Sequence, residues 1–242
     1  MFPQPNTRLR RRMFVDISFV LLMLLLGATS THATEITIWN FNDSDLLADF
    51  GTGTLMSDFN VANILFAAGT TTNARLGAPA GQALSLQGGT GTANNGRNIT
   101  FSVSTLGFAN IIVSFATQGT STGFNANQFQ YSLDGLTFVN FGSPYTPATA
   151  FGSTPVIFNL SAIPGLNDNP SAAFRIVFNG STSSTGNNRL DNLVIEGTAA
   201  TATIPEPTTA LLLLTGLTGI LGLKRKRQVA AQRARPPGLD RN

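Results

Sequence analysis

Residues 128–141 read QFQYSLDGLTFVNF, and this stretch decides the fold. Apolar and polar residues alternate over 129–133, which is the two-residue period of a half-buried strand. Asp134-Gly135 then forms a turn dipeptide that tolerates positive φ, and residues 137–141 supply a second strand. The stretch therefore predicts an antiparallel β-hairpin.

The same pattern continues on both sides of the hairpin. Short runs with strand character are separated by turns rich in Gly, Asn, Ser, Thr and Pro, and no convincing amphipathic helix occurs. Nine or ten such strands predict an all-β domain over 34–196, a two-sheet antiparallel β-sandwich of the jelly-roll type. The further predicted strands are 36–41, 83–87, 99–103, 110–118, 155–160, 174–178 and 189–196.

The N-terminal segment has the features of a secretory signal peptide. Four arginines between positions 8 and 12 precede the apolar run 17–26, and small residues lead to Ala33. We expect signal peptidase to remove residues 1–33. An uncleaved N-terminal anchor is the alternative, although the apolar run is short for a stable span.

Three signals follow one another near the C-terminus. A Pro-Glu-Pro turn cannot lie inside a helix, so a helix must begin after it. An apolar run then predicts a transmembrane helix over 208–223, and a basic cluster favours retention of its end in the cytoplasm. The turn is Pro205, Glu206 and Pro207, and the cluster, which serves as a membrane stop signal, is Lys224, Arg225, Lys226 and Arg227.

In this order and spacing, residues 204–227 resemble the sorting signal of the PEP-CTERM proteins. The resemblance implies recognition of the Pro-Glu-Pro residues by a membrane-embedded exosortase, cleavage nearby, and delivery to the cell surface or the medium. Residues 197–203 then serve as a tether, and 228–242 form a basic cytoplasmic tail. An ordinary C-terminal membrane anchor is the alternative, but a permanent span needs about 20 apolar residues.

Charge and composition exclude several classes of function. Eleven of the fifteen Lys and Arg residues lie in the terminal segments, so 34–204 holds four arginines against nine acidic residues, a formal charge of −5. Nucleic acid is therefore not an expected partner. The chain has no cysteine, and its one histidine, His32, falls in the signal peptide. This excludes His- or Cys-based catalysis and an ordinary zinc or haem site.

The first and last predicted strands carry a second resemblance. Residues 38–43, IWNFND, and residues 188–195, NRLDNLVI, are similar to segments of jelly-roll and carbohydrate-binding-like sandwiches attached to bacterial surface-sorting tags. The resemblance implies a shape more than a function. It also implies that the two terminal strands pair.

Acidic residues supply one candidate site. Asp43, Asp45 and Asp49 offer oxygen ligands that suit calcium, and Asp191 would join them or pair with Arg189 on the same strand face. The competing interpretation is that the aspartates are turn residues that cap their own backbone. No other cofactor is expected.

Aromatic residues supply a second candidate, because sugar-binding sandwiches stack exposed rings on pyranoses. Trp39 and Tyr131 share strand faces with apolar residues and are expected in the core. Tyr145 lies in a predicted loop and is the candidate ligand contact. Paired carboxylates could support glycoside hydrolysis, but the domain's two glutamates, Glu35 and Glu196, fall near its ends.

Three functions remain open. The leading hypothesis is a non-enzymatic surface or extracellular-matrix protein that associates with exopolysaccharide or with copies of itself. The second is a specific carbohydrate-binding module, and the third is a glycoside-active enzyme.

Overall fold

The computed structural model describes residues 33–200. Residues 1–32 of the predicted signal peptide lie outside the described residues, as do the Pro-Glu-Pro turn, the helix over 208–223, the basic cluster and the tail over 228–242. No helix within 33–200 is long and apolar enough to cross a membrane.

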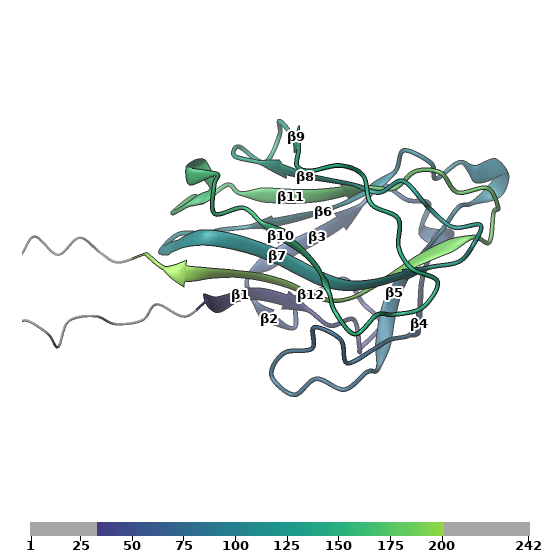
Figure 1. Cartoon of the computed structure of the whole chain (residues 1–242), viewed down its shortest axis with the longest axis horizontal. Coiled ribbons are helices and arrows are strands. Elements are labelled where there is room, and N and C mark those ends of the chain that lie inside the picture. Colours follow the sequence, from purple (N-terminus) through teal and green to yellow (C-terminus); the bar gives the residue numbers. More distant parts are fainter. Residues whose placement is uncertain (1–32, 201–242) are drawn as a thin grey trace, which may run out of the picture. The chain divides into compact units, whose positions relative to one another are not determined.

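Two antiparallel sheets pack face to face (Figure 1). The seven-stranded sheet, sheet A, runs in the order β10 (Val156–Asn159), β7 (Phe108–Gly119), β12 (Asn187–Ala199), β1 (Ala33–Trp39) and β2 (Phe50–Gly51), with β5 (Gln82–Gln87) on β12 and β4 (Ile64–Ala68) on β5. The five-stranded sheet, sheet B, runs β3 (Gly53–Ser57), β6 (Asn98–Val103), β11 (Ala173–Val177), β8 (Gln128–Ser132) and β9 (Val139–Asn140). Single 3-10 turns occur at Val61–Asn63, Thr90–Thr92 and Pro164–Leu166.

This architecture confirms the predicted two-sheet antiparallel sandwich. From β5 to β8 successive strands alternate between the two sheets, and β10, β11 and β12 do so again. Such crossing connections are found in jelly rolls, and the jelly-roll assignment itself stays a prediction.

The terminal strands pair, as the sandwich resemblance implied. β1 and β12 are antiparallel, with Ala33 opposite Thr198 and Trp39 opposite Leu193. The chain therefore enters and leaves the domain at the same end of the sandwich. β12 continues to Ala199, which corrects the predicted start of the tether at residue 197: Thr198 and Ala199 are held in the sheet by pairing with β7.

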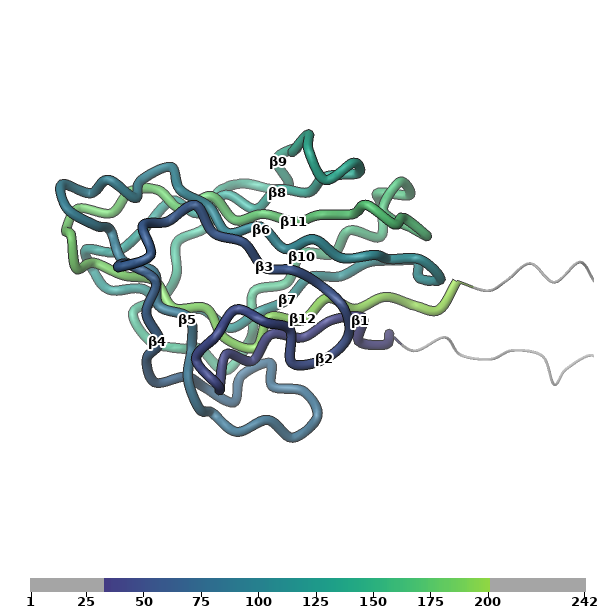
Figure 2. The backbone as a smooth tube through the Cα atoms, turned by 180° about the vertical axis from the view of Figure 1, so that it is seen from behind, coloured from purple at the N-terminus to yellow at the C-terminus, as the bar shows by residue number. Residues whose placement is uncertain are grey.

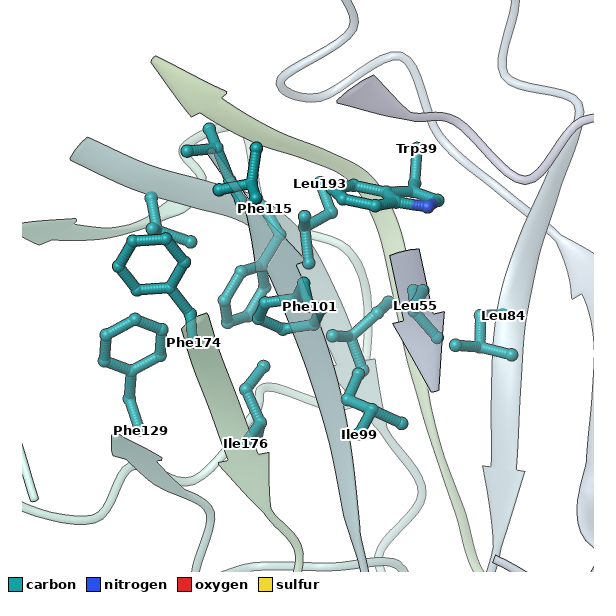
Figure 3. Packing of buried hydrophobic residues seen from close by; sticks show 14 of the residues in the cluster. Trp39, Leu55, Leu84, Ile99, Phe101, Phe115, Phe129, Phe174, Ile176 and Leu193 are labelled. Carbon is teal, nitrogen blue, oxygen red and sulfur yellow. The ribbon is translucent and has the colours of Figure 1, made fainter. Parts of the chain in front are cut away.

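The core consists of the inward-facing residues of both sheets, and the alternation in the sequence identified many of them. Phe101, Phe129 and Phe174 are fully buried (Figure 3). The ring of Phe129 stacks on that of Phe158, with centroids 3.9 Å apart and planes 6° apart. Trp39 is fully buried, as expected.

Three strands were not predicted, and the strand predicted at 137–141 is much shorter in the structure. β2, β3 and β4 are short strands that lie next to glycines or carry weak alternation. β9 has two residues instead of the predicted 137–141, because the Asp134 carboxylate accepts hydrogen bonds from the N–H groups of Leu136 and Thr137 and thereby widens the turn. Gly135 has the expected positive φ, 73°.

We predict that Phe129→Ala destabilises the domain by about 3–5 kcal/mol, because it leaves a cavity where three aromatic rings meet Phe129 in the core. Chemical denaturation of the purified protein measures the loss. Leu136→Ala is the control, since that side chain is 84% exposed and its removal should change stability by less than about 0.5 kcal/mol. Equal effects of the two substitutions would contradict the packing described above.

Candidate functional site

A groove of about 580 Å³ lies where β1 ends, between two loops. One wall is the β1–β2 loop, residues 40–49, and the other is the β4–β5 loop, residues 69–81. Figures 1 and 2 show the two loops together beside β1 and β2. The lining combines polar and apolar side chains, among them Asn40, Asn42, Asp43, Asp49, Phe50, Arg75, Leu76 and Pro79.

Asn42 joins the two walls. Its Oδ1 accepts a hydrogen bond from the N–H of Gln82 (2.8 Å), and its Nδ2 donates to the carbonyl of Pro79 (3.2 Å). Gly81 has φ +40°, and a Cβ there would run into the Asn42 amide. The close approach of the two loops therefore requires glycine at this position.

The β1–β2 loop turns sharply and returns to the end of β1. Phe41 has φ 56° while its ring stays buried in the core, so the chain reverses directly after a core anchor. Asp49 closes the loop: its Oδ2 accepts from the N–H of Asn40 (2.6 Å), and its own N–H donates to the carbonyl of Ile38 (2.9 Å).

The aspartates of this loop influence one another. Partial burial raises the pKa of Asp49, and the negative charges of Asp43 and Asp45 raise it further, while the hydrogen bond from Asn40 opposes the shift. Three of the four predicted calcium ligands are thus electrostatically coupled in one loop. Asp45 also accepts from the N–H of Leu47 (2.7 Å), which is the capping role that competed with metal binding.

Asp191 lies elsewhere, in the interior. Its carboxylate is fully buried and accepts hydrogen bonds from the N–H groups of Thr70 (2.7 Å) and Asn192 (2.8 Å). The predicted ion pair with Arg189 is wrong: among the described residues no carboxylate lies within ion-pair distance of Arg189, whose Nη1 donates to the carbonyl of Ala68 (3.1 Å).

A bulge in β12 explains this position. The pairing of β12 with β7 shifts between Asp191 and Val194, and Asn192 has φ 49°. The bulge lets Asn192 face the β4–β5 loop on the same side as its neighbour Asp191. The Nδ2 of Asn192 donates to the carbonyls of Thr70 (2.7 Å) and Thr72 (3.0 Å), so adjacent side chains fasten the start of the loop to sheet A.

Arg75 fastens the middle of the same loop. Its Nε lies 3.5 Å from Glu35 Oε1, and its Nη2 lies 3.5 Å from Glu196 Oε2. These glutamates face each other across the β1–β12 pair. The two glutamates near the domain ends are thus neighbours bridged by a single guanidinium.

Tyr145 does not occupy an exposed loop. Its backbone forms a bridge with Asn127, and its ring packs against Phe115 and Phe158 at centroid distances of 6.2 and 6.0 Å. The hydroxyl is buried without a hydrogen-bond partner among the described residues, and burial raises its pKa. The residue as a whole is half-buried, and its ring packs against the core.

In the part of the chain that the structure describes, no three acidic, histidine or cysteine side chains cluster in a way that could hold a metal ion. Calcium bound by Asp43 and Asp45 stays a prediction. The Asp191 carboxylate instead accepts hydrogen bonds from Thr70 and Asn192, away from the other aspartates.

Sequence reasoning did not identify the aromatic residue of the groove or the residues that build it. Phe50 is 42% exposed and lines the groove, although an exposed ligand-binding ring was expected only among Trp and Tyr. The clustering of Asn, Asp and Gly in both loops was the available signal, because these residues favour positive φ and side-chain bonds to backbone.

No family model and no curated protein matches the chain. Solved structures with similar arrangements include a family 61 carbohydrate-binding module in complex with β-1,4-galactotriose, at 12% identity and TM-score 0.40, covering 64% of this chain and 92% of that one. A xylan-binding module, CBM22-1, of Paenibacillus barcinonensis Xyn10C has 10% identity and TM-score 0.43, with coverages of 71% and 99%. The K2 cleaved adhesin domain of Lys-gingipain has 11% identity and TM-score 0.40, with coverages of 67% and 97%. At this level of similarity, the ligands named for these proteins belong to those proteins alone.

The buried Asp191 predicts a particular pH dependence of stability. Burial raises its pKa from 3.8 to about 7, against the opposing hydrogen bonds from Thr70 and Asn192. The folded protein therefore binds this proton more tightly than the unfolded chain does, and the stabilisation is present at low pH and lost as pH rises from about 4 to about 7. The free energy of unfolding should fall by up to about 1.4 kcal/mol per pH unit from this group.

Denaturation of wild type and Asp191→Asn between pH 5 and pH 8 measures this contribution. The difference in unfolding free energy between the two proteins should change with pH in favour of wild type at pH 5. Parallel pH profiles for the two proteins would show that Asp191 does not titrate in this window.

Proposed function

We propose that this chain is an exported, non-enzymatic surface or extracellular-matrix protein whose sandwich binds a saccharide in the groove between the β1–β2 and β4–β5 loops. The observation that carries the proposal is the presence of accessible apolar side chains and unsatisfied polar groups in one preformed hollow.

The lining suits the two chemical faces of a sugar. Phe50 is 42% exposed and Leu76 is 74% exposed, so both offer apolar surface to the C–H face of a pyranose ring. Among the described residues, the Asp43 carboxylate, the Oδ1 of Asp49 and the Nδ2 of Asn40 have no hydrogen-bond partner. These acceptors and this donor are available to sugar hydroxyls.

Both walls of the groove are fixed before a ligand arrives. Asn42 ties the loops to each other, and Asp191 and Arg75 tie the β4–β5 loop to sheet A. Binding therefore requires little ordering of the backbone, and a preorganised site loses less conformational entropy on binding.

The position of the two glutamates favours binding without turnover. Glycoside hydrolysis uses two carboxyl groups on opposite sides of the scissile bond. The two glutamates of the domain, Glu35 and Glu196, instead share one guanidinium on the surface of sheet A. Within 33–200 there is also no histidine or cysteine to act as base or nucleophile.

Export and sorting are proposed from the two ends of the sequence. Signal peptidase removes residues 1–33, the chain spans the inner membrane transiently, and exosortase recognises Pro205, Glu206 and Pro207. The product reaches the cell surface or the medium and associates with exopolysaccharide. The pairing of β1 with β12 supports this arrangement, because it brings the exits of the domain toward both signals to one end.

We expect Phe50→Ala and Asp49→Asn each to weaken saccharide binding at least about tenfold, because each removes one of the two kinds of contact that a sugar ring needs. Affinity electrophoresis of the mature protein in gels that contain purified exopolysaccharide from the producing cells measures the effect. Leu65→Ala is the matched control, since Leu65 is similarly exposed, at 41%, but lies on β4 outside the groove lining.

Retardation that is unchanged in Phe50→Ala and Asp49→Asn would refute the groove as the site. Release of new reducing ends from the polysaccharide, lost in a carboxylate variant that still folds, would instead identify an enzyme.

The sorting proposal predicts the mass of the mature protein. Intact mass spectrometry of protein from a host that contains exosortase should show loss of everything beyond the Pro-Glu-Pro region. Replacement of Pro205, Glu206 and Pro207 by alanine should preserve the C-terminal residues. A wild-type mass that still includes residues 208–242 would point to an ordinary membrane anchor.

A further inference from the structure

The outer face of sheet B carries a row of side chains that crosses all five strands and is polar on four of them. One residue from each strand lies in register with the next, and these residues point away from the core. We call them the outer row: Met56 on β3, Thr100 on β6, Arg175 on β11, Gln130 on β8 and Asn140 on β9.

The burial pattern shows which way the row faces. Ile99 and Phe101, which flank Thr100 along β6, are fully buried, while Thr100 itself is half-buried. Arg175 is likewise half-buried between the buried Phe174 and Ile176. Since side chains alternate along a strand, the row belongs to the solvent side of sheet B.

Three of these side chains are held in a fixed chain of contacts. The Nε of Arg175 donates to the Oε1 of Gln130 (2.8 Å), and the Nε2 of Gln130 donates to the Oδ1 of Asn140 (2.7 Å). The Arg175 guanidinium also lies 3.8 Å from the centroid of the Phe138 ring. A long cation is thus ordered by a ring on one face and by an amide on one edge.

The terminal nitrogens of Arg175 remain available. Among the described residues they make no hydrogen bond and no ion pair. Asp58 is near enough to act on the guanidinium electrostatically, yet its two oxygens accept from the backbone N–H (2.6 Å) and the side-chain Nδ2 (2.7 Å) of Asn98. Burial lowers the pKa of Arg175, which reflects a partly desolvated cation.

An ordered guanidinium with free N–H donors fits a carboxylate, which it can bind through two parallel hydrogen bonds. Amides and a threonine hydroxyl on either side fit hydroxyl groups. A polysaccharide with carboxylate-bearing sugars offers both along an extended line.

We propose that the outer row is a second binding surface, which takes a uronate-containing polysaccharide with a sugar carboxylate on the Arg175 fork and neighbouring hydroxyls on Gln130, Asn140 and Thr100. The residues of this surface belong to sheet B and those of the groove to sheet A and its loops, so the proposal does not depend on the groove. A domain with both surfaces can bridge two polymer chains and cross-link a matrix.

The test measures binding of the exported protein to polygalacturonate by isothermal titration calorimetry at physiological ionic strength. We expect Arg175→Ala to weaken binding at least about tenfold, and Arg175→Lys to weaken it about threefold or more because lysine lacks the fork. Arg97→Ala removes the same charge from an exposed arginine that, among the described residues, has no ring or amide to order it, and it should change affinity less than about twofold.

Several results would overturn the proposal. Absence of binding by wild type is one, equal losses in Arg175→Ala and Arg97→Ala are another, and full affinity in Arg175→Lys is a third. Equal affinity for dextran sulfate and for polygalacturonate would show that the surface recognises negative charge in general and not the sugar carboxylate. Phe50→Ala should leave polygalacturonate binding intact. Failure of the groove proposal and failure of the outer-row proposal are therefore distinguishable. The melting temperature of each variant confirms that it is folded.

Discussion

The pairing of β12 with three other strands is the constraint on which sheet A depends. Its thirteen residues pair with β7 on one side, and on the other side the first half pairs with β5 and the second half with β1. A strand with neighbours on both sides has little freedom to slip, since a shift by one residue would exchange its buried and exposed faces. The bulge at Asp191 is therefore held at one place, and the loop fastened to it is held too.

Through this arrangement, only a few side chains connect the core to the groove. The bulge places Asp191 and Asn192 against the β4–β5 loop, and Asn42 connects that loop to the one after β1. Most contacts in the series are hydrogen bonds between an amide or carboxylate side chain and the backbone. Such bonds fix loops that have no regular structure, because they satisfy backbone groups that a strand would otherwise pair.

The sequence was sufficient to predict the sandwich because a half-buried strand appears in the sequence as an alternation of apolar and polar residues. Phe101, Phe129 and Phe174 alternate with polar residues, and all three are in the core. The alternation is weaker in β2 and β4, because these strands are short and lie at sheet edges, where alternation is less strictly required.

The groove was only partly predictable. Asp43 and Asp49 were found because carboxylates are conspicuous in a chain with few charges. That they line one groove with Arg75 depends on contacts between residues distant in sequence, which no local pattern encodes. Asp191 shows the same limit: the strand is regular from Arg189 to Asp191, but the carboxylate accepts from the N–H of Thr70 and Arg189 donates to the carbonyl of Ala68, and both partners are distant in sequence.

The shared exit of the two chain ends has a mechanical consequence. Ala33 lies opposite Thr198, so a force that pulls the ends of the domain apart acts across the β1–β12 ladder and not along it. Hydrogen bonds between antiparallel strands run perpendicular to the strands, and such a load would open them one pair at a time from the exit inward. A domain that is held at one end only is loaded differently. The force then enters through one terminal strand, and the other terminal strand carries no opposing force. A sandwich held to a surface only through its C-terminal end would keep β1 in place under pulls that would peel it away if both ends were fixed.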